Sequence, residues 1–163
     1  MLDGVATQVK LGGFARQTAM SKSVAGTKNL LKLHAGDALT GSLYYTFFKG
    51  AADAQMMNSI CFDALTPGNH AFDDSDTVLK GFVDELARGS CKTSVISSNV
   101  VAAAGTALAP TGSAAYLQSW VIKVIDGVKV GIVGVTIAGK TVNSSRARCA
   151  GTIRTRQWSP KRV

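Results

Sequence analysis

Hydrophobic residues along this chain follow two spacings, one typical of helices and one typical of strands. Within residues 75–88 the apolar positions recur at steps of three and four with acids between them, which predicts an amphipathic helix. Residues 51–60 are rich in Ala and Met and have helical character, and a further helix is predicted to start near residue 13. Short apolar runs predict three strands, at residues 30–35, 61–66 and 93–99.

A hairpin is predicted after these elements. Two apolar runs, residues 120–125 and 128–135, flank Asp126-Gly127, a pair that tolerates the positive φ angles of a tight turn. Residues 102–115 are small and rich in Gly, Pro and Ser, so they are predicted to be a loop. The alternation of strands and helices, followed by a hairpin, predicts an α/β fold with a mixed β-sheet and flanking helices.

Charge divides the chain into two parts. The net charge is +8, but six of the 18 basic residues lie in residues 144–163, which contain no acid. We therefore predict a domain over residues 1–143 and a basic, disordered tail over residues 144–163. Such a tail is able to bind polyanions, but a solvated end is the simpler interpretation, and nucleic acid is not an expected partner.

The cysteines and the apolar runs exclude some classes. No two of Cys61, Cys91 and Cys149 have CxxC spacing, and an odd number does not suggest a disulfide framework, so Cys61 is expected to be a small buried hydrophobic residue. No apolar run approaches the roughly 20 residues of a membrane helix, and no signal-peptide pattern starts the chain. These features do not identify the cellular compartment of the protein.

Two short polar motifs follow predicted strands. Gly36-Asp37 follows the first strand, and Gly68-Asn69-His70 follows the second. Parallel α/β sheets bind ligands at the carboxyl ends of their strands, and a glycine lets the backbone approach a ligand closely. Carboxylate and amide oxygens are hard metal ligands, and an imidazole supplies a nitrogen or a proton. These residues are the candidate site.

The order of the two motifs resembles the calcineurin-like metallophosphoesterase superfamily. The flanking segments LKLHAGDALTGSLYYTFFKGAADAQMMN and CFDALTPGNHAFDDSD are similar to its 5′-nucleotidase branch, as are LGGFARQ, SVISSNVV and GVKVGIVGVT. The resemblance covers roughly residues 10–145. It implies part of a two-sheet β-sandwich with helices outside, related to hydrolysis of nucleoside 5′-monophosphates or similar phosphomonoesters.

The resemblance also implies residue roles. Two divalent cations share a bridging carboxylate, which Asp37 matches, and Asn69 matches a ligand of one of them. His70 matches the histidine that faces the phosphate. The cations activate the attacking water, so no protein nucleophile is implied.

Other parts of the pattern are absent from this sequence. The family's N-terminal Asp-x-His motif and its later Gly-His-x-His motif have no match, and the chain has only two histidines, His34 and His70. Ala71 stands where the family commonly has Glu. The site is therefore incomplete, and we expect hydrolysis by the chain alone to be weak or lost. The alternative is a non-catalytic remnant whose basic tail binds polyanions.

The resemblance also suggests what this incompleteness means for the fold. The chain is expected to start after the family's first strand, which leaves an unpaired sheet edge through which copies can associate or aggregate. Many relatives are exported, but no segment of this sequence tests that for the present chain.

Three further residues are candidates for supporting the site. Asp73 matches a family Asp, and it is equally suited to capping the helix after Ser75. Asn99 matches a family Asn and either supports the site or closes a turn. His34 lies two residues before Gly36 and is able to reach a metal, although a lone strand histidine is more often packed. The aromatic residues at 44, 45, 47 and 48 favour a core role over base stacking.

One motif suggests a third function. Residues 134–141 fit the P-loop pattern GxxxxGK[ST] after a predicted strand. A P-loop also needs a following helix and an acid for magnesium, and no Asp or Glu occurs after Asp126. The P-loop nucleotide binder is therefore the least favoured of the three functions.

Overall fold

The centre of the molecule is a small parallel sheet. The computed structural model describes residues 4–6, 8, 12–112, 114–137 and 154–155. Three short strands pair in the order β1-β2-β3, all parallel, with Ala64 opposite both Leu33 and Ser94. Their bounds are Leu33–His34, Ala64–Leu65 and Ser94–Val95. Parallel pairing brings the loops after the three strands to one edge of the sheet.

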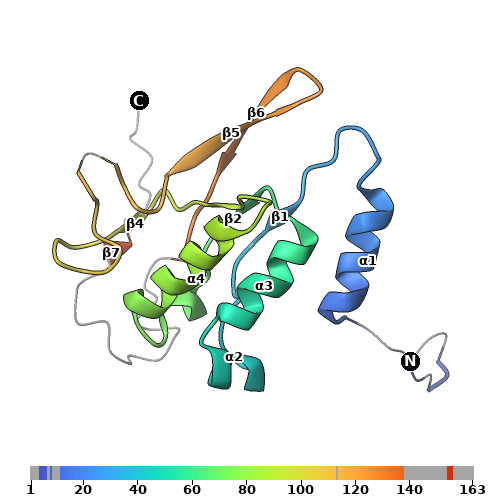
Figure 1. The fold of residues 1–163 in the computed structure, drawn as a ribbon, viewed down its shortest axis with the longest axis horizontal. Coiled ribbons are helices and arrows are strands. Elements are labelled where there is room, and N and C mark those ends of the chain that lie inside the picture. The colour runs from blue at the N-terminus through green and yellow to red at the C-terminus, as the bar shows by residue number, and fades with distance from the viewer. Residues whose placement is uncertain (1–3, 7, 9–11, 113, 138–153, 156–163) are drawn as a thin grey trace.

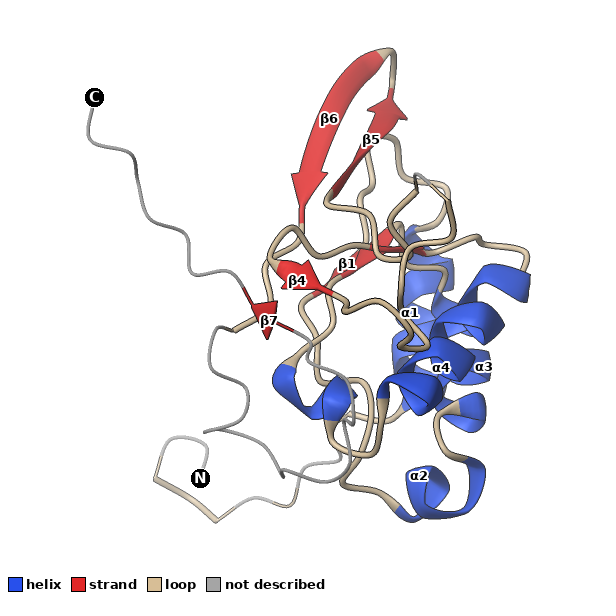
Figure 2. Ribbon diagram, turned by 90° about the vertical axis from the view of Figure 1, so that its left-hand side faces the viewer, coloured by secondary structure: helices blue, strands red, loops and turns tan. Residues whose placement is uncertain are grey.

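Helices lie on one side of these strands (Figure 2). Three of them stand side by side (Figure 1): α1 (Phe14–Val24), α3 (Ala51–Ile60) and α4 (Asp76–Arg88). Helix α1 is tied to the end of α3 by the Ser21 hydroxyl, which donates to the Ile60 carbonyl at 2.8 Å. A short helix, α2 (Leu43–Phe48), precedes α3, and a 3₁₀ turn, η1 (Asn69–Phe72), follows β2.

The core forms where α4 meets the sheet. Leu79 and Leu86 of α4 are fully buried and Phe82 is nearly so, in the three- and four-residue spacing read from the sequence. They share one cluster with Leu65 of β2 and Met57 of α3. The β2–α4–β3 unit therefore positions the loop after β2.

An antiparallel hairpin follows the sheet. Strand β5 (Trp120–Ile125) pairs with β6 (Val128–Val133) through a turn in which Asp126 has φ 49° and Gly127 has φ 78°. Ser98 joins the hairpin to the end of β3, because its backbone N–H donates to the Gly134 carbonyl at 2.8 Å. A second antiparallel pair joins β4 (Val100–Val101) to β7 (Arg154–Thr155).

Most sequence predictions of elements are confirmed. The α/β class, helices α1, α3 and α4, the strand in each of the three apolar runs and the hairpin all occur, although β1, β2 and β3 are each only two residues long. Of the basic segment 144–163, only β7 is described, so the division of the chain at residue 143 stays a prediction. Residues 138–141 of the P-loop pattern lie outside the described residues.

Two predictions were wrong. Cys61 is not an isolated buried residue: it forms a disulfide with Cys91, whose Cα atom lies 5.1 Å from its own. The core role of the aromatic cluster holds only for Tyr45. Tyr44, Phe47 and Phe48 are exposed on α2, because the helix buries a single side chain and turns its other large residues outward.

None of the helices in the described ranges combines the length and the apolar character needed to span a membrane.

Candidate functional site

The two motif loops pack backbone against backbone. A Cβ at Gly36 would lie 2.7 Å from the Gly68 nitrogen, and one at Gly68 would collide with the Asp37 carboxylate. Gly36 also has φ 107°, which strongly favours glycine. Asp37 has φ 54°, a left-handed conformation that Asp tolerates better than most residues. Glycine at both positions is therefore what allows the loops after β1 and β2 to touch.

Asp37 and His70 are in direct contact. The backbone N–H of His70 donates to Asp37 Oδ1 at 3.2 Å, across 33 positions of sequence. Asn69 lies between Gly68 and His70 at the start of η1. The structure therefore brings the three residues that match the family's motifs to the carboxyl ends of β1 and β2, as the sequence predicts. Their roles as metal ligands and as a phosphate contact stay predictions.

Asp73 completes this cluster. Its Oδ2 lies 2.7 Å from His70 Nδ1, while Ser75 occupies the capping position of α4 and accepts from the Val78 N–H at 3.2 Å. Ser75, rather than Asp73, therefore caps α4. The hydrogen bond to Asp73 raises the pKa of His70, more than burial lowers it. The contact holds the ring through Nδ1 and favours its positive form.

The neighbouring Asp74 is held by side chains of α2 and its C-cap. The Tyr45 hydroxyl donates to Asp74 Oδ2 at 3.0 Å, and Lys49 Nζ lies 2.9 Å from the same oxygen. Burial and this hydrogen bond raise the pKa of Tyr45. Sequence reasoning missed this support, because an aromatic run does not show which hydroxyl meets an acid. The link fixes α2 beside the loop that carries His70.

His34 contacts the Gly36 turn, and Asn99 contacts a residue that follows β6. His34 Nδ1 accepts from the Gly36 N–H at 3.2 Å, and its ring packs edge-on against Phe62 with centroids 5.1 Å apart. Burial lowers the pKa of His34, against the opposing charge of Asp37. These contacts favour the packed role for this histidine. Asn99 is buried immediately before β4, and its side-chain nitrogen donates to the Thr136 carbonyl.

The donor set is too small for the two-cation site that the resemblance implies. In the part of the chain that the structure describes, no three His, Cys, Asp or Glu side chains gather as metal ligands would. Asp37 and Asn69 offer hard oxygen atoms, but no further histidine is available because His34 is packed against Phe62. Among the described residues, Asp37 and Asn69 therefore supply only part of the ligand set of such a site.

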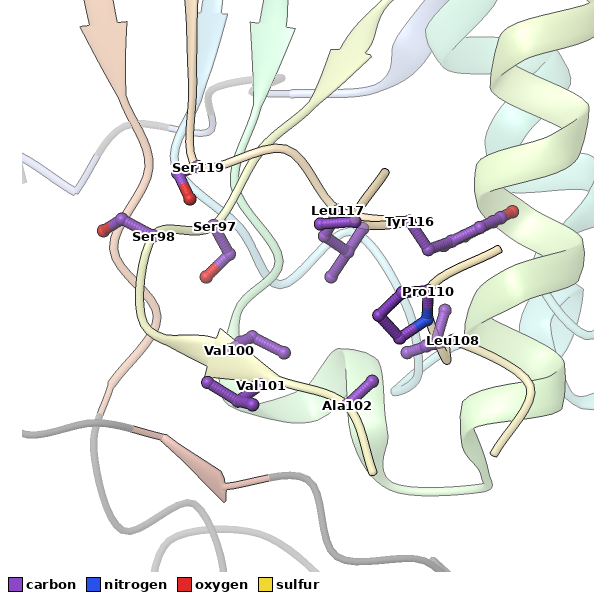
Figure 3. A pocket seen from close by; sticks show the side chains of 11 residues that line it. Ser97, Ser98, Val100, Val101, Ala102, Leu108, Pro110, Tyr116, Leu117 and Ser119 are labelled. Atoms are coloured by element: carbon purple, nitrogen blue, oxygen red, sulfur yellow. The ribbon is translucent and has the colours of Figure 1, made fainter. Parts of the chain in front are cut away.

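A separate cavity of about 240 Å³ lies beyond the end of β3. Figure 3 shows Ser97, Ser98 and Ser119 at one end of it and Tyr116, Pro110 and Leu108 at the other. None of the predicted site residues lines this cavity. The cavity is thus distinct from the Asp37–His70 cluster, although Ser97 belongs to the buried network next to that cluster.

Known proteins resemble this chain over most of its length. It is 39% identical over 148 residues to NAD 5′-nucleotidase of Haemophilus influenzae and 38% identical over 146 residues to a probable 5′-nucleotidase of Treponema pallidum. These matches cover 88% and 87% of the chain, which spans 22% of each relative's length. No protein-family model matches the chain.

Solved structures agree with the sequence matches. NAD nucleotidase of Haemophilus influenzae superposes with a TM-score of 0.76 at 37% identity, over 93% of this chain and 28% of that one. A 5′-nucleotidase precursor of Thermus thermophilus gives 0.75 at 30% identity, over 90% and 26%. With two motif loops at the ends of parallel strands, the fold is that of the 5′-nucleotidase hydrolases. These matches identify the chain as a partial domain of the 5′-nucleotidase branch.

Proposed function

We propose that this chain forms the part of a nucleotide phosphohydrolase that carries Asp37, Asn69 and His70. In the whole protein the reaction is removal of the 5′ phosphate from a nucleoside 5′-monophosphate. Support comes from the relatives named 5′-nucleotidase at 37–39% identity. The observation that carries the proposal is the hydrogen bond from the His70 N–H to Asp37 Oδ1, which joins the two motif loops.

His70 is the residue we assign to the phosphate. Asp73 holds its Nδ1, so the ring is oriented and its other nitrogen, Nε2, is the atom that donates to a phosphate oxygen. The raised pKa of His70 increases the share of imidazolium, whose charge complements the phosphate. Divalent cations, when bound in the whole protein, supply further positive charge at the phosphate. Asp37 and Asn69 are the ligands that we assign to them from this chain.

Phosphate release from AMP tests the proposal. We expect the chain, given Mg²⁺, Mn²⁺ or Zn²⁺, to release phosphate slowly from AMP and more slowly from 3′-AMP. His70→Gln and Asp37→Asn should each lower the rate about 100-fold, because each removes a charged group from the site. Asp126→Asn is the matched control: Asp126 is also exposed with φ 49°, but it lies in the hairpin turn. Equal rates for all four proteins would contradict the proposal.

The alternative function is a non-catalytic remnant of such an enzyme. It is favoured by one observation, the small donor set among the described residues. A chain that releases no phosphate from AMP with any of the three cations, and whose binding of heparin falls steeply with salt, would support the remnant.

A further inference from the structure

Thr136 is a buried polar residue that contacts the loop carrying His70. It lies three residues after β6 and is 1% exposed. Its Oγ1 donates to the Pro67 carbonyl at 2.9 Å, immediately before Gly68-Asn69-His70. A carbonyl only accepts, so the single hydroxyl proton of Thr136 is committed to Pro67. The hydroxyl oxygens of Thr136 and Ser97 lie 2.9 Å apart, and Thr136 has no proton left to donate in this contact. The Ser97 hydroxyl therefore donates either to Thr136 or to Asn99 Oδ1, which lies 3.2 Å away.

Asn99 holds Thr136 at both of its backbone polar groups. The Thr136 N–H donates to Asn99 Oδ1 at 2.9 Å, and Asn99 Nδ2 donates to the Thr136 carbonyl at 2.6 Å. The two bonds identify which side-chain atom of Asn99 is oxygen and which is nitrogen. Asn99 thus pairs with Thr136 as a peptide group of a neighbouring strand would. Thr136 has little freedom to shift, because moving it would leave buried donors and acceptors without partners.

This network joins three segments at the site edge of the sheet. Asn99 follows β3, Thr136 follows β6, and Pro67 follows β2. From Pro67 the chain enters Gly68, which has no room for a side chain, and reaches the His70 N–H that meets Asp37. The position of the Pro67 carbonyl therefore controls where the amide of His70 lies relative to the carboxylate of Asp37.

We propose that Thr136 is a positioning residue whose hydroxyl, held by Asn99, fixes the Pro67 carbonyl and so keeps His70 against Asp37. That Thr136 holds His70 against Asp37 is argued from the contacts of this chain alone. That this position affects hydrolysis rests on the proposed function. Thr136 acts through the backbone and does not itself touch the substrate.

Thr93 offers a matched control within the same sheet. It is 5% exposed, and its Oγ1 donates to the Phe62 carbonyl at 2.8 Å. It precedes β3, so its hydrogen bond lies at the amino end of the strands rather than at the site edge. Thr→Val at either position removes one buried hydroxyl of the same kind, and only the Thr136 change touches the loop of His70.

The test measures amide hydrogen exchange by NMR, taking the ratio of the His70 rate to that of Phe82 in α4. We expect Thr136→Val to raise this ratio about tenfold, since one buried hydrogen bond holds the loop. Thr136→Ser keeps the hydroxyl and should leave the ratio within about twofold of the original, as should Thr93→Val. If Thr136→Val does not fold, Asn99→Asp is the second variant, because its carboxylate accepts from the Thr136 N–H but cannot donate to the Thr136 carbonyl.

Two outcomes separate the proposals. An unchanged exchange ratio in Thr136→Val, or an equal rise in Thr93→Val, overturns the positioning role. AMP hydrolysis measured on the same proteins should fall with Thr136→Val and return with Thr136→Ser. If the ratio rises as expected while the unsubstituted chain releases no phosphate, the proposed function fails and the positioning of His70 stands.

Discussion

At the scale of single residues, the candidate site depends on two positions where a side chain is missing. Gly36 and Gly68 lie so close together that a Cβ atom on either one would collide with the other loop. The polar groups of Asp37 and His70 meet only because those two backbones touch. Glycine content alone does not show this, since several other glycines of the chain have nothing within 4 Å of their missing Cβ.

Gly68→Ala should destabilise the chain by about 2 kcal/mol, because the added methyl group pushes the Asp37 carboxylate away. Urea unfolding followed by circular dichroism measures the change. Gly81→Ala is the matched control: Gly81 lies inside α4 with open space around it, so alanine should stabilise the helix by about 0.5 to 1 kcal/mol. Equal effects of the two alanines would contradict the close packing of the loops.

The pKa values of the two histidines should be shifted in opposite directions from the ordinary value. In the metal-free chain, NMR should find the pKa of His70 raised by Asp73 and that of His34 lowered by burial. Asp73→Asn should lower the pKa of His70 and leave His34 unchanged. Because the folded pKa of His70 is raised, its stabilising contribution is complete below the unfolded value of about 6.5 and disappears as pH rises through the folded value. A lower pKa for His70 than for His34 would rule out the Asp73 contact.

At the scale of elements, the spacing of apolar residues predicted the helices and strands that follow a regular pattern. It missed the features that depend on a single contact. Helix α4 and the hairpin follow clear spacings, so both were predictable from sequence. Helix α2 was not, because LYYTFF has no polar face, and its start depends on Ser42, whose hydroxyl accepts from the Tyr45 N–H at 3.1 Å. Sequence also could not pair Cys61 with Cys91, since their approach depends on how α3 and α4 pack.

The candidate site was predictable to a similar extent. The motifs placed Asp37, Asn69 and His70 at strand ends, and parallel pairing brings them together. Thr136 was not predictable, because a threonine after an apolar strand looks like any strand residue. Its contact with Pro67 spans 69 positions of sequence, and only the packed sheet brings the two together.

Reducing the disulfide should lower the free energy of unfolding by about 3 to 4 kcal/mol, because it opens a covalent loop with a sequence separation of 30. Chemical unfolding with and without dithiothreitol measures the loss. The double variant Cys61→Ala/Cys91→Ala should show a similar low stability and no response to the reductant. A full response in that variant would assign the effect elsewhere.

At the scale of the whole molecule, large apolar side chains remain exposed on the hairpin. Trp120, Ile122 and Val124 of β5 point to one face of the pair, and Val133 lies opposite Trp120 on that face. The hairpin projects from the rest of the molecule (Figure 1). Such a face attracts apolar surface, so we predict that copies of the chain associate through it, in addition to the association through an unpaired sheet edge that the sequence predicts.

Sedimentation velocity should therefore find oligomers that grow with protein concentration. The double variant Ile122→Lys/Val124→Lys should shift the chain toward monomer by placing two charges on the exposed face. Gln8→Lys/Gln55→Lys is the control, since it adds the same charge at exposed polar positions away from the hairpin. Equal dissociation by both variants would assign the effect to net charge rather than to the face.

The covalent loop between Cys61 and Cys91 has a consequence for proteolysis. The loop contains His70, Asp73 and all of α4, while Asp37 lies outside it. A protease that cuts once between residues 62 and 90 yields a nicked chain that still migrates as a single species on a non-reducing gel. Adding a reductant then splits it into two pieces, one carrying Asp37 and the other carrying the segment after the cut.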